Sequence, residues 1–255
     1  MGPHARTRRT AAAAKEHSGS QLGLIRNQSI FEKLEPLAVV IRTRRRQKLA
    51  IASDQEDTLY LVRRGFMLAQ ASLAGNRTQI LSILTPGDVY RTAAMPPLAG
   101  TALTSTNDQG EVWRVRWPVA SEGPSRDSAL ENLLSRQLAE QAARLALHAA
   151  IVGGLTGEER VASLYAELAL RTGKASHAGV TFEMPISRVD IAEYLSLNAD
   201  TVSRIVSRMR ARGLIAEAGR GFILCRDIEA LMRECPVART LEAMHPAKLI
   251  TAQVA

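Results

Sequence analysis

One helical face near residue 200 carries the strongest chemical signal in the sequence. An apolar stripe recurs there every three or four residues, formed by Val202, Ile205, Val206 and Met209. Because this stripe must be buried, Asp200, Ser203 and Arg204 face the other way, with Ser207 beside them. Further arginines surround the helix, namely Arg188, Arg208, Arg210 and Arg212. A charged, solvated face is the plain alternative, but this set suits hydrogen bonds to a polyanion.

Two short helices joined by a tight turn would hold that face in place. Ser187 and Asp190 have the spacing of a capping box at the start of the first helix. The turn Ser196-Leu197-Asn198 follows, and Asn198 can cap the second helix, which closes at Arg212-Gly213. Two short helices with a three-residue turn form a helix-turn-helix, so we predict this unit over Ser187 to Gly213.

The elements on either side of this unit are also marked in the sequence. Upstream, an Ala/Leu/Glu-rich segment predicts a helix from Glu158 to about Arg171, followed by a polar loop from Thr172 to Gly179. Downstream, Leu214-Ile215 and Phe222 to Cys225 flank a glycine-rich turn at residues 218–221. This pattern predicts a β-hairpin, the wing, which carries Arg220 at its tip.

A long helix precedes this region and needs a partner for its apolar side. The stripe spans about seven turns and consists of Leu130, Leu134, Leu138, Ala142, Leu145, Ala149 and Val152. Gly153-Gly154 ends the helix. We expect the stripe to pair with a second copy of the chain, which gives a homodimer. Packing of the stripe against the chain's own N-terminal domain is the alternative.

The N-terminal part reads as a β domain. Short apolar runs broken by turn residues extend from Leu37 to Trp117. The runs at Leu59–Val62, Gln79–Leu84 and Glu111–Trp117 have the length and composition of strands, at nearly hairpin spacing. We therefore predict a small antiparallel barrel or sandwich.

Composition limits the class of protein. The chain has 255 residues, enough for two domains, and a net charge of +8. That charge fits a polyanionic partner, nucleic acid first and an acidic membrane surface second. Residues 1–20 are basic and lack an apolar signal core, so we expect a disordered tail there. No apolar run of about 18 residues is present, so we expect no membrane segment and a cytoplasmic location.

The stretch from Met184 to Ile215 resembles the helix-turn-helix of the CRP/FNR superfamily of bacterial regulators almost throughout. Weaker similarity at Gly65 and Gln79–Asp88 extends the resemblance over roughly Leu34 to Asp227. It implies an α+β fold with an N-terminal jelly-roll barrel like a cyclic-nucleotide-binding domain, a long dimerisation helix and a C-terminal winged helix-turn-helix. We accordingly divide the chain into a tail (1–20), a sensor domain (21–124), a dimerisation helix (125–153), a winged domain (154–228) and a C-terminal helix and tail (229–255).

The resemblance also implies how double-stranded DNA is read. In this family the base-reading positions fall on Asp200, Ser203 and Arg204, a pattern similar to the FNR and FixK-like branches that read TTGA half-sites. Those branches usually carry glutamate where this chain has Asp200, whose side chain is one methylene shorter. We expect phosphate contacts from Ser187, Arg188, Asn198, Thr201, Ser207, Arg208 and Arg220. Contact with RNA polymerase is implied by the resemblance alone.

The sensor sequence lacks the residue types that would bind a known effector. Aligned from Pro86-Gly87-Asp88, the positions that bind cyclic AMP in the family fall near Arg91-Thr92 and Gly100-Thr101, without the defining glutamate and arginine. The barrel region also lacks cysteine and histidine to hold an iron-sulfur cluster or haem. We therefore expect no cofactor and no metal, with a ligand-gated regulator that has a divergent pocket as the alternative.

The remaining reactive residues give no enzyme site. Cys225 and Cys235 are too few for a disulfide framework and fit a reducing compartment. Cys225 is either a buried strand residue or a redox site near the DNA. We expect His148 and His177 to be polar surface residues. No nucleophile and base stand in a convincing setting, so we expect a regulator and not an enzyme.

Overall fold

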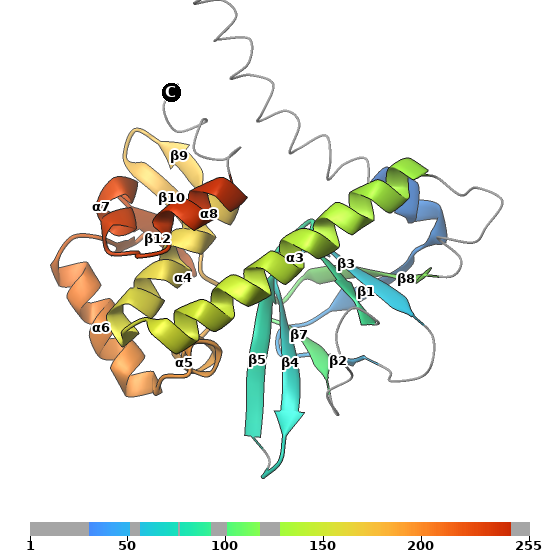
Figure 1. Cartoon of the computed structure of the whole chain (residues 1–255), viewed down its shortest axis with the longest axis horizontal. Coiled ribbons are helices and arrows are strands. Elements are labelled where there is room, and N and C mark those ends of the chain that lie inside the picture. Colours follow the sequence, from blue (N-terminus) through green and yellow to red (C-terminus); the bar gives the residue numbers. More distant parts are fainter. Residues whose placement is uncertain (1–30, 52–56, 76, 93–100, 118–127, 246–255) are drawn as a thin grey trace, which may run out of the picture.

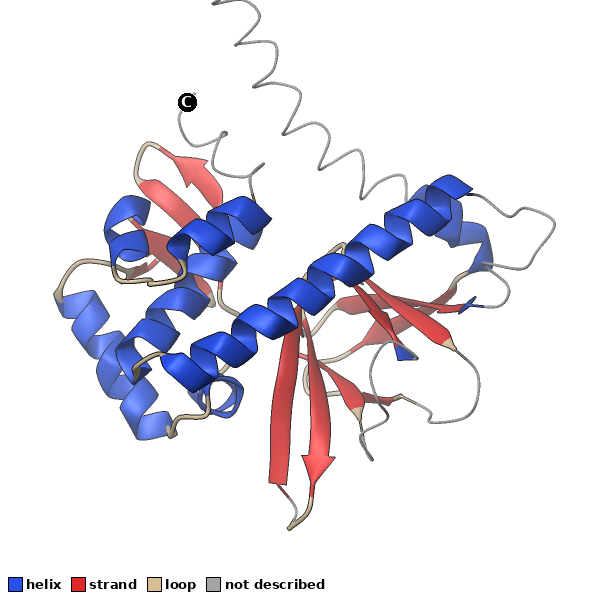
Figure 2. Ribbon diagram, in the orientation of Figure 1, coloured by secondary structure: helices blue, strands red, loops and turns tan. Residues whose placement is uncertain are grey.

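A computed structural model of the chain describes residues 31–51, 57–75, 77–92, 101–117 and 128–245. Within these ranges the chain forms an N-terminal β domain, a long helix and a C-terminal helical domain with a small sheet (Figures 1 and 2). This arrangement confirms the predicted fold class. The basic tail predicted for residues 1–20 lies outside the described residues.

The N-terminal domain consists of two antiparallel sheets. One has the order β1 (Val39–Thr43), β8 (Gly110–Arg116), β3 (Thr58–Arg64) and β6 (Val89–Arg91). The other has the order β2 (Lys48–Ala50), β7 (Ala102–Ser105), β4 (Met67–Leu73) and β5 (Arg77–Leu84). A short 3-10 helix, η1 (Glu35–Leu37), precedes β1. The three strand runs predicted from sequence lie in β3, β5 and β8.

Apolar side chains of both sheets pack against one another in the interior of this domain. They form one cluster, made of Tyr60, Val62, Met67, Ala69, Leu84, Tyr90, Leu103 and Val112. All eight are buried to at least nine-tenths, so the space between the sheets is filled by protein side chains.

The long helix α3 (Ser128–Gly154) runs alongside both domains (Figure 1). Its first part packs on the N-terminal domain, where Leu130 and Leu134 join a core cluster with Leu59, Trp113 and Val115. Leu134 is only 1% exposed. The prediction that Leu130 and Leu134 pair with a second copy is therefore wrong, because their side chains are already covered by the chain's own sheet. The packing alternative holds for this end of the helix.

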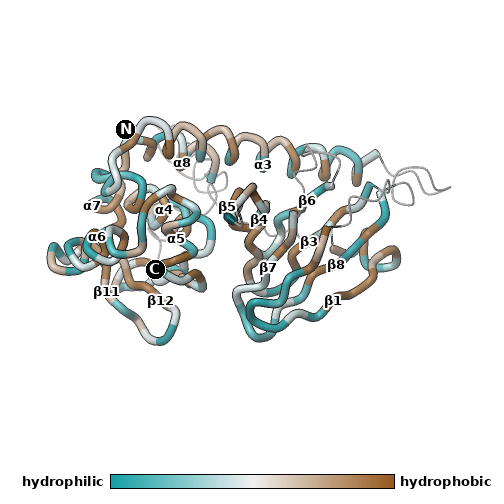
Figure 3. The backbone as a smooth tube through the Cα atoms, turned by 90° about the horizontal axis from the view of Figure 1, so that it is seen from below, coloured by the Kyte–Doolittle hydropathy of each residue, from teal (hydrophilic) through white to brown (hydrophobic). Residues whose placement is uncertain are grey.

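The other predicted stripe residues lie differently. Leu138, Leu145 and Val152 are half-buried, whereas Ala142 and Ala149 are exposed. Alanine fills much of the exposed side, at Ala139, Ala142, Ala143, Ala146, Ala149 and Ala150. Figure 3, coloured by hydropathy, shows α3 passing beside both domains. No helix within the described ranges has the length and apolarity needed to cross a bilayer.

The C-terminal domain is built around α4 (Gly157–Thr172). The helices α5 (Arg188–Leu195), α6 (Ala199–Ala211), α7 (Ile228–Arg233) and α8 (Ala238–Met244) surround it. A four-stranded sheet completes the domain, in the order β11 (Ala216–Glu217), β12 (Phe222–Cys225), β10 (Gly179–Glu183) and β9 (Lys174–Ser176). The helix predicted from Glu158 to about Arg171 is confirmed as α4.

The loop predicted from Thr172 to Gly179 is partly wrong. Residues 174–176 form β9, which pairs with β10 in a hairpin. β10 in turn pairs with β12, so that Val180 lies opposite Cys225 and Phe182 opposite Ile223. β9 has only three residues, Lys174–Ser176, which is too short for an alternating pattern to mark it as a strand.

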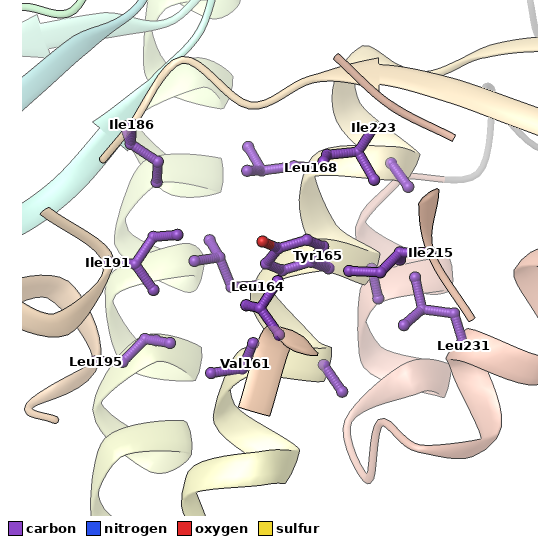
Figure 4. Close-up of a cluster of buried hydrophobic side chains, with 14 of the residues drawn as sticks. Val161, Leu164, Tyr165, Leu168, Ile186, Ile191, Leu195, Ile215, Ile223 and Leu231 are labelled. Atoms are coloured by element: carbon purple, nitrogen blue, oxygen red, sulfur yellow. The ribbon is translucent and has the colours of Figure 1, made fainter. Parts of the chain in front are cut away.

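Tyr165 lies at the centre of this domain with a fully buried side chain. Figure 4 shows it among apolar residues of α4, α5 and the sheet, including Leu164, Ile191 and Ile223. Every residue of α4 from Val161 to Arg171 is buried. A helix covered on all sides needs no single apolar stripe, which explains its Ala/Leu-rich sequence.

Candidate nucleic-acid interface

The helix-turn-helix forms where the sequence predicts it. At the start of α5, Ser187 Oγ accepts from the Asp190 backbone N at 3.2 Å, and Asp190 Oδ2 accepts from the Ser187 backbone N at 2.8 Å. The turn places Ser196 in the left-handed region with φ 53°. Asn198 Oδ1 then accepts from the Thr201 backbone N at 2.7 Å and caps α6. These hydrogen bonds fix where both helices begin.

Packing fixes the rotation of α6. Its predicted stripe is confirmed, because Val202, Ile205, Val206 and Met209 are at most 5% exposed. Asp200, Ser203, Arg204 and Ser207 are all exposed. The helix therefore presents a carboxylate, two hydroxyls and a guanidinium on one accessible face. A major groove has the width to admit such a helix.

Neighbouring groups on α6 restrain the side chains of this face. Arg204 Nη2 donates to Thr201 Oγ1 at 3.3 Å. Ser203 Oγ donates to the Ala199 carbonyl at 2.8 Å, which turns its hydroxyl toward the helix backbone. Across the described residues, Arg204 has no ion-pair partner, so its charge is not offset within the chain. It is thus restrained by a neutral hydroxyl and still able to bind an anion or a base edge.

Three arginines at the end of α6 differ from Arg204, because each pairs with a carboxylate of the same domain. Arg208 pairs with Glu158 at 2.6 Å, Arg210 pairs with Glu217, and Arg212 pairs with Glu234 at 2.5 Å. These pairs are exposed to solvent and contribute little to stability. Arg208 would have to exchange its carboxylate for a phosphate to make the contact predicted for it.

Arg188 is more firmly held. Its Nη1 donates to the hydroxyl of Tyr165 at 3.0 Å, so the side chain links α5 to the core of α4. Burial raises the pKa of Tyr165 and the nearby Arg188 charge opposes that rise, which leaves the phenol neutral. Arg188 therefore has a structural role besides the phosphate contact predicted for it.

Sequence reading missed Arg160. Its Nη1 donates to the Leu195 carbonyl at 3.1 Å and its Nε donates to the Leu155 carbonyl at 2.8 Å. It thereby joins the end of α5 to the segment before α4. Nothing local in the sequence marks this role, because Leu195 lies 35 positions away.

The wing is present with a small shift of its first strand. β11 covers Ala216–Glu217, whereas Leu214 and Ile215 are buried in the core just before it. The turn places Gly219 and Gly221 at positive φ, 107° and 79°, where glycine is strongly favoured. Arg220 lies between them and is exposed at the tip, as predicted.

Neither cysteine is set up for reaction. Cys225 is fully buried, and burial raises the pKa of its thiol to about 11. Burial likewise raises the pKa of the Cys235 thiol, which donates to Ser163 Oγ at 3.3 Å. A protonated buried thiol is a poor nucleophile, so the structure favours the strand-core alternative for Cys225 over the redox site.

The two histidines have different surroundings. His177 is exposed in the β9–β10 turn, as expected. His148 stacks on Tyr194 with ring centroids 3.9 Å apart, and burial lowers its pKa. The expectation that His148 is a surface residue is therefore wrong. Over the described ranges, no three His, Cys, Asp or Glu side chains come together as metal ligands would.

In the sensor domain, Arg91 already has internal partners. It forms an ion pair with Asp57, where Nε lies 2.8 Å from Oδ2, and its guanidinium lies 4.2 Å from the centroid of a Trp117 ring. Thr92 Oγ1 accepts from the Thr58 backbone N at 2.9 Å. The Arg91-Thr92 pair therefore joins strands of this domain. Gly100, the position of the expected phosphate arginine, lies outside the described residues.

Comparisons with known proteins agree with this geometry. Residues 159–234 match the Crp-like helix-turn-helix domain family. The chain is 29% identical over 189 residues to the transcriptional regulatory protein btr of Bordetella pertussis, covering 72% of this chain and 76% of that protein. It is also 29% identical over 182 residues to the nitrogen fixation regulation protein FixK of Rhizobium meliloti, covering 71% and 80%. The structure of FixK2 from Bradyrhizobium japonicum has the same fold, with a TM-score of 0.66 and 24% identity over 78% of this chain and 97% of that one.

Proposed function

We propose that this chain is a transcription regulator of the CRP/FNR superfamily that binds an inverted-repeat operator as a homodimer without cyclic AMP, which its similarity to the Crp-like helix-turn-helix family and to FixK supports. The half-site we propose resembles TTGA. The exposed polar face of α6 carries this proposal. We further propose that the protein works in the cytoplasm and contacts RNA polymerase when bound to its operator.

Three side chains of α6 are proposed to read bases. The Arg204 guanidinium can donate two hydrogen bonds to O6 and N7 of a guanine. The Asp200 carboxylate can accept from N4 of a cytosine, and Ser203 can approach the methyl group of a thymine. Because the Ser203 hydroxyl already donates to the Ala199 carbonyl, its exposed methylene suits such an apolar contact. Asp200 is one methylene shorter than the usual glutamate, so its base is the least defined.

Phosphate contacts would surround this central set. Ser187 and Asn198 lie at the starts of α5 and α6, where the helix dipoles favour an anion. Thr201, Ser207 and Arg208 follow along α6, and Arg220 extends from the wing. Arg188 can take part if it keeps its hydrogen bond to Tyr165, since a guanidinium has five donors.

The dimer contact we propose is the exposed alanine-rich side of α3. It replaces the Leu130 and Leu134 end of the predicted stripe with Ala139, Ala142, Ala143, Ala146, Ala149 and Ala150. Small side chains allow two helix axes to approach closely. Leu138, Leu145 and Val152 are half-buried and would border this contact. A second copy would then place two α6 helices on one side of the DNA duplex.

Competition binding tests the base-reading role of Arg204. We expect Arg204→Ala to cost about 1 to 3 kcal/mol per half-site and to relax discrimination at one guanine only. Operators changed one base pair at a time would measure this. Arg64→Ala is the matched control, because Arg64 is an exposed arginine of the sensor domain. Equal weakening of every operator by Arg204→Ala would show a phosphate contact and contradict the proposed docking of α6.

A further inference from the structure

A cluster of buried charges lies where the two domains and α3 meet. Asp88 comes from the turn between β5 and β6, Arg144 from α3, and Arg171 and Glu167 from α4. Side-chain exposure is 9% for Asp88, 10% for Arg144 and 5% for Arg171. We call these three residues the junction triad. The proposed function leaves this cluster without a role.

Asp88 holds the triad together. Its Oδ1 accepts from Arg144 Nη2 at 2.9 Å, and its Oδ2 forms an ion pair with Arg171. The same Oδ2 accepts from the backbone N of Thr85 at 2.7 Å. Burial alone would raise the pKa of Asp88, but the two arginines and Thr85 hold it below its ordinary value. Asp88 is therefore ionised, and one carboxylate joins both domains and α3.

Arg171 makes the contact from the DNA-binding side. Besides Asp88, it donates to the Ile83 carbonyl at 3.2 Å and to Thr85 Oγ1 at 3.1 Å, both in the sensor domain. Glu167 Oε1 accepts from Arg171 Nη1 at 3.0 Å within α4. A planar guanidinium with several fixed partners permits only a narrow range of orientations. The triad thus restricts rotation of α4 against the sensor domain.

The short link between α3 and α4 does not by itself fix the orientation of α4. Only Leu155 and Thr156 separate α3 from α4, and two glycines, Gly153 and Gly154, end α3. A Cβ added at either glycine would meet no atom within 4 Å, so no side chain packs against the two glycines, and the hydrogen bond from Arg160 to the Leu155 carbonyl holds the segment that follows them. Glycine has wide backbone freedom. Side-chain contacts across the junction must therefore set the angle between α3 and the DNA-binding domain.

Further contacts cross the same junction, among them two hydrogen bonds and the stacking of His148 of α3 on Tyr194 of α5. Gln79 Nε2 in β5 donates to the Glu193 carbonyl of α5 at 2.7 Å. Asn107 Nδ2 donates to Glu183 Oε1 of β10 at 2.8 Å. These two hydrogen bonds are only partly buried, whereas the triad is charged and buried. Apolar side chains of β4 and β5, such as Leu68 and Ile83, also share one core cluster with the C-terminal domain. Among these contacts, only the triad would leave a buried charge unpaired if one partner were lost.

We propose that Asp88, Arg144 and Arg171 are positioning residues that set the half-site spacing the dimer accepts. This inference rests on the proposed function, since it requires two α6 helices on one operator. If α3 forms the dimer axis, the angle between α3 and the winged domain determines the distance between the two recognition helices. Half-sites lie about one turn, roughly 34 Å, apart, and one added base pair shifts them by about a tenth of that turn. A fixed angle therefore selects one spacing.

The test uses the full chain and duplexes with two TTGA-like half-sites separated by five, six, seven or eight base pairs. The Asp88→Asn variant keeps an oxygen for Thr85 and removes the charge that pairs with the arginines. We expect the wild-type protein to favour one spacing about tenfold or more, and Asp88→Asn to reduce that preference to within about threefold. Discrimination against a mutated half-site should stay as in wild type, because α6 is untouched.

Two more variants complete the design. Arg144→Gln removes one of the two arginines that pair with Asp88 and should give an intermediate loss of spacing preference. This variant can still be tested if Asp88→Asn does not fold. Arg91→Gln breaks an ion pair confined to the sensor domain and should keep the wild-type preference. An unchanged preference in both triad variants overturns this inference alone. A wild-type protein that binds inverted repeats no better than random duplex overturns the proposed function and this inference with it.

Discussion

Two arginines, one in each domain, use their charges in opposite ways. On α6, Arg204 is exposed and its charge is not offset by a carboxylate within the described chain. In the sensor domain, Arg91 is paired with Asp57 and packed on Trp117, while the interior between the sheets is apolar. Groups left unpaired at a surface can bind a ligand, whereas groups paired inside a domain stabilise it. This contrast supports our proposal that the C-terminal domain, which matches the Crp-like helix-turn-helix family, is the part that reads DNA.

The largest effect we predict separates packing from dimerisation on α3. Leu134→Ala should cost about 2 to 5 kcal/mol of stability, because Leu134 is a core residue of the sensor domain. Chemical denaturation followed by tryptophan fluorescence would measure this loss. Leu138→Ala is the comparison, since Leu138 is only half-buried and should cost less. An equal loss of unfolding free energy in the two variants would contradict the packing of Leu134 in the sensor core.

Dimerisation should fail when a charge enters the alanine-rich side of α3. We expect Ala146→Glu to give monomers in analytical ultracentrifugation and to weaken operator binding by about a hundredfold, because avidity between half-sites is lost. Ala243→Glu, on an exposed position of α8, is the matched control and should remain dimeric. If Ala146→Glu sediments like wild type, the interface lies elsewhere.

The wing should contribute affinity without specificity. Arg220→Ala should weaken binding to all sequences alike and reduce the salt dependence by about one phosphate contact. Titrations at several salt concentrations, on operator and on unrelated duplex, measure both effects. A loss confined to one operator position would instead assign a base contact to Arg220.

The smallest expected effect concerns the sensor domain. Because Arg91 is already paired with Asp57, we expect no saturable heat when millimolar cyclic AMP is titrated into the protein. Calorimetry would measure this directly. A micromolar dissociation constant would show that residues outside the described ranges complete a nucleotide site, and the ligand-gated alternative would then hold.

Local signals predicted the DNA-binding unit well. The capping residues Ser187 and Asn198 and the Val202 stripe depend on neighbours within a few positions, so sequence spacing alone predicts them. The side of α3 that is left exposed could not be predicted, because a stripe does not say which surface covers Leu134. The junction triad was missed for a similar reason, since Asp88 and Arg171 lie 83 positions apart.

Selection of bound duplexes from a random pool tests the central claim most directly. With the full chain as the binding protein, we expect enrichment of an inverted repeat with two TTGA-like halves about one helical turn apart. The Arg204→Ala variant should enrich a repeat that has lost its preference at one guanine of each half. Recovery of unrelated sequences, or of a single unpaired half-site, would contradict a dimer that reads DNA through α6.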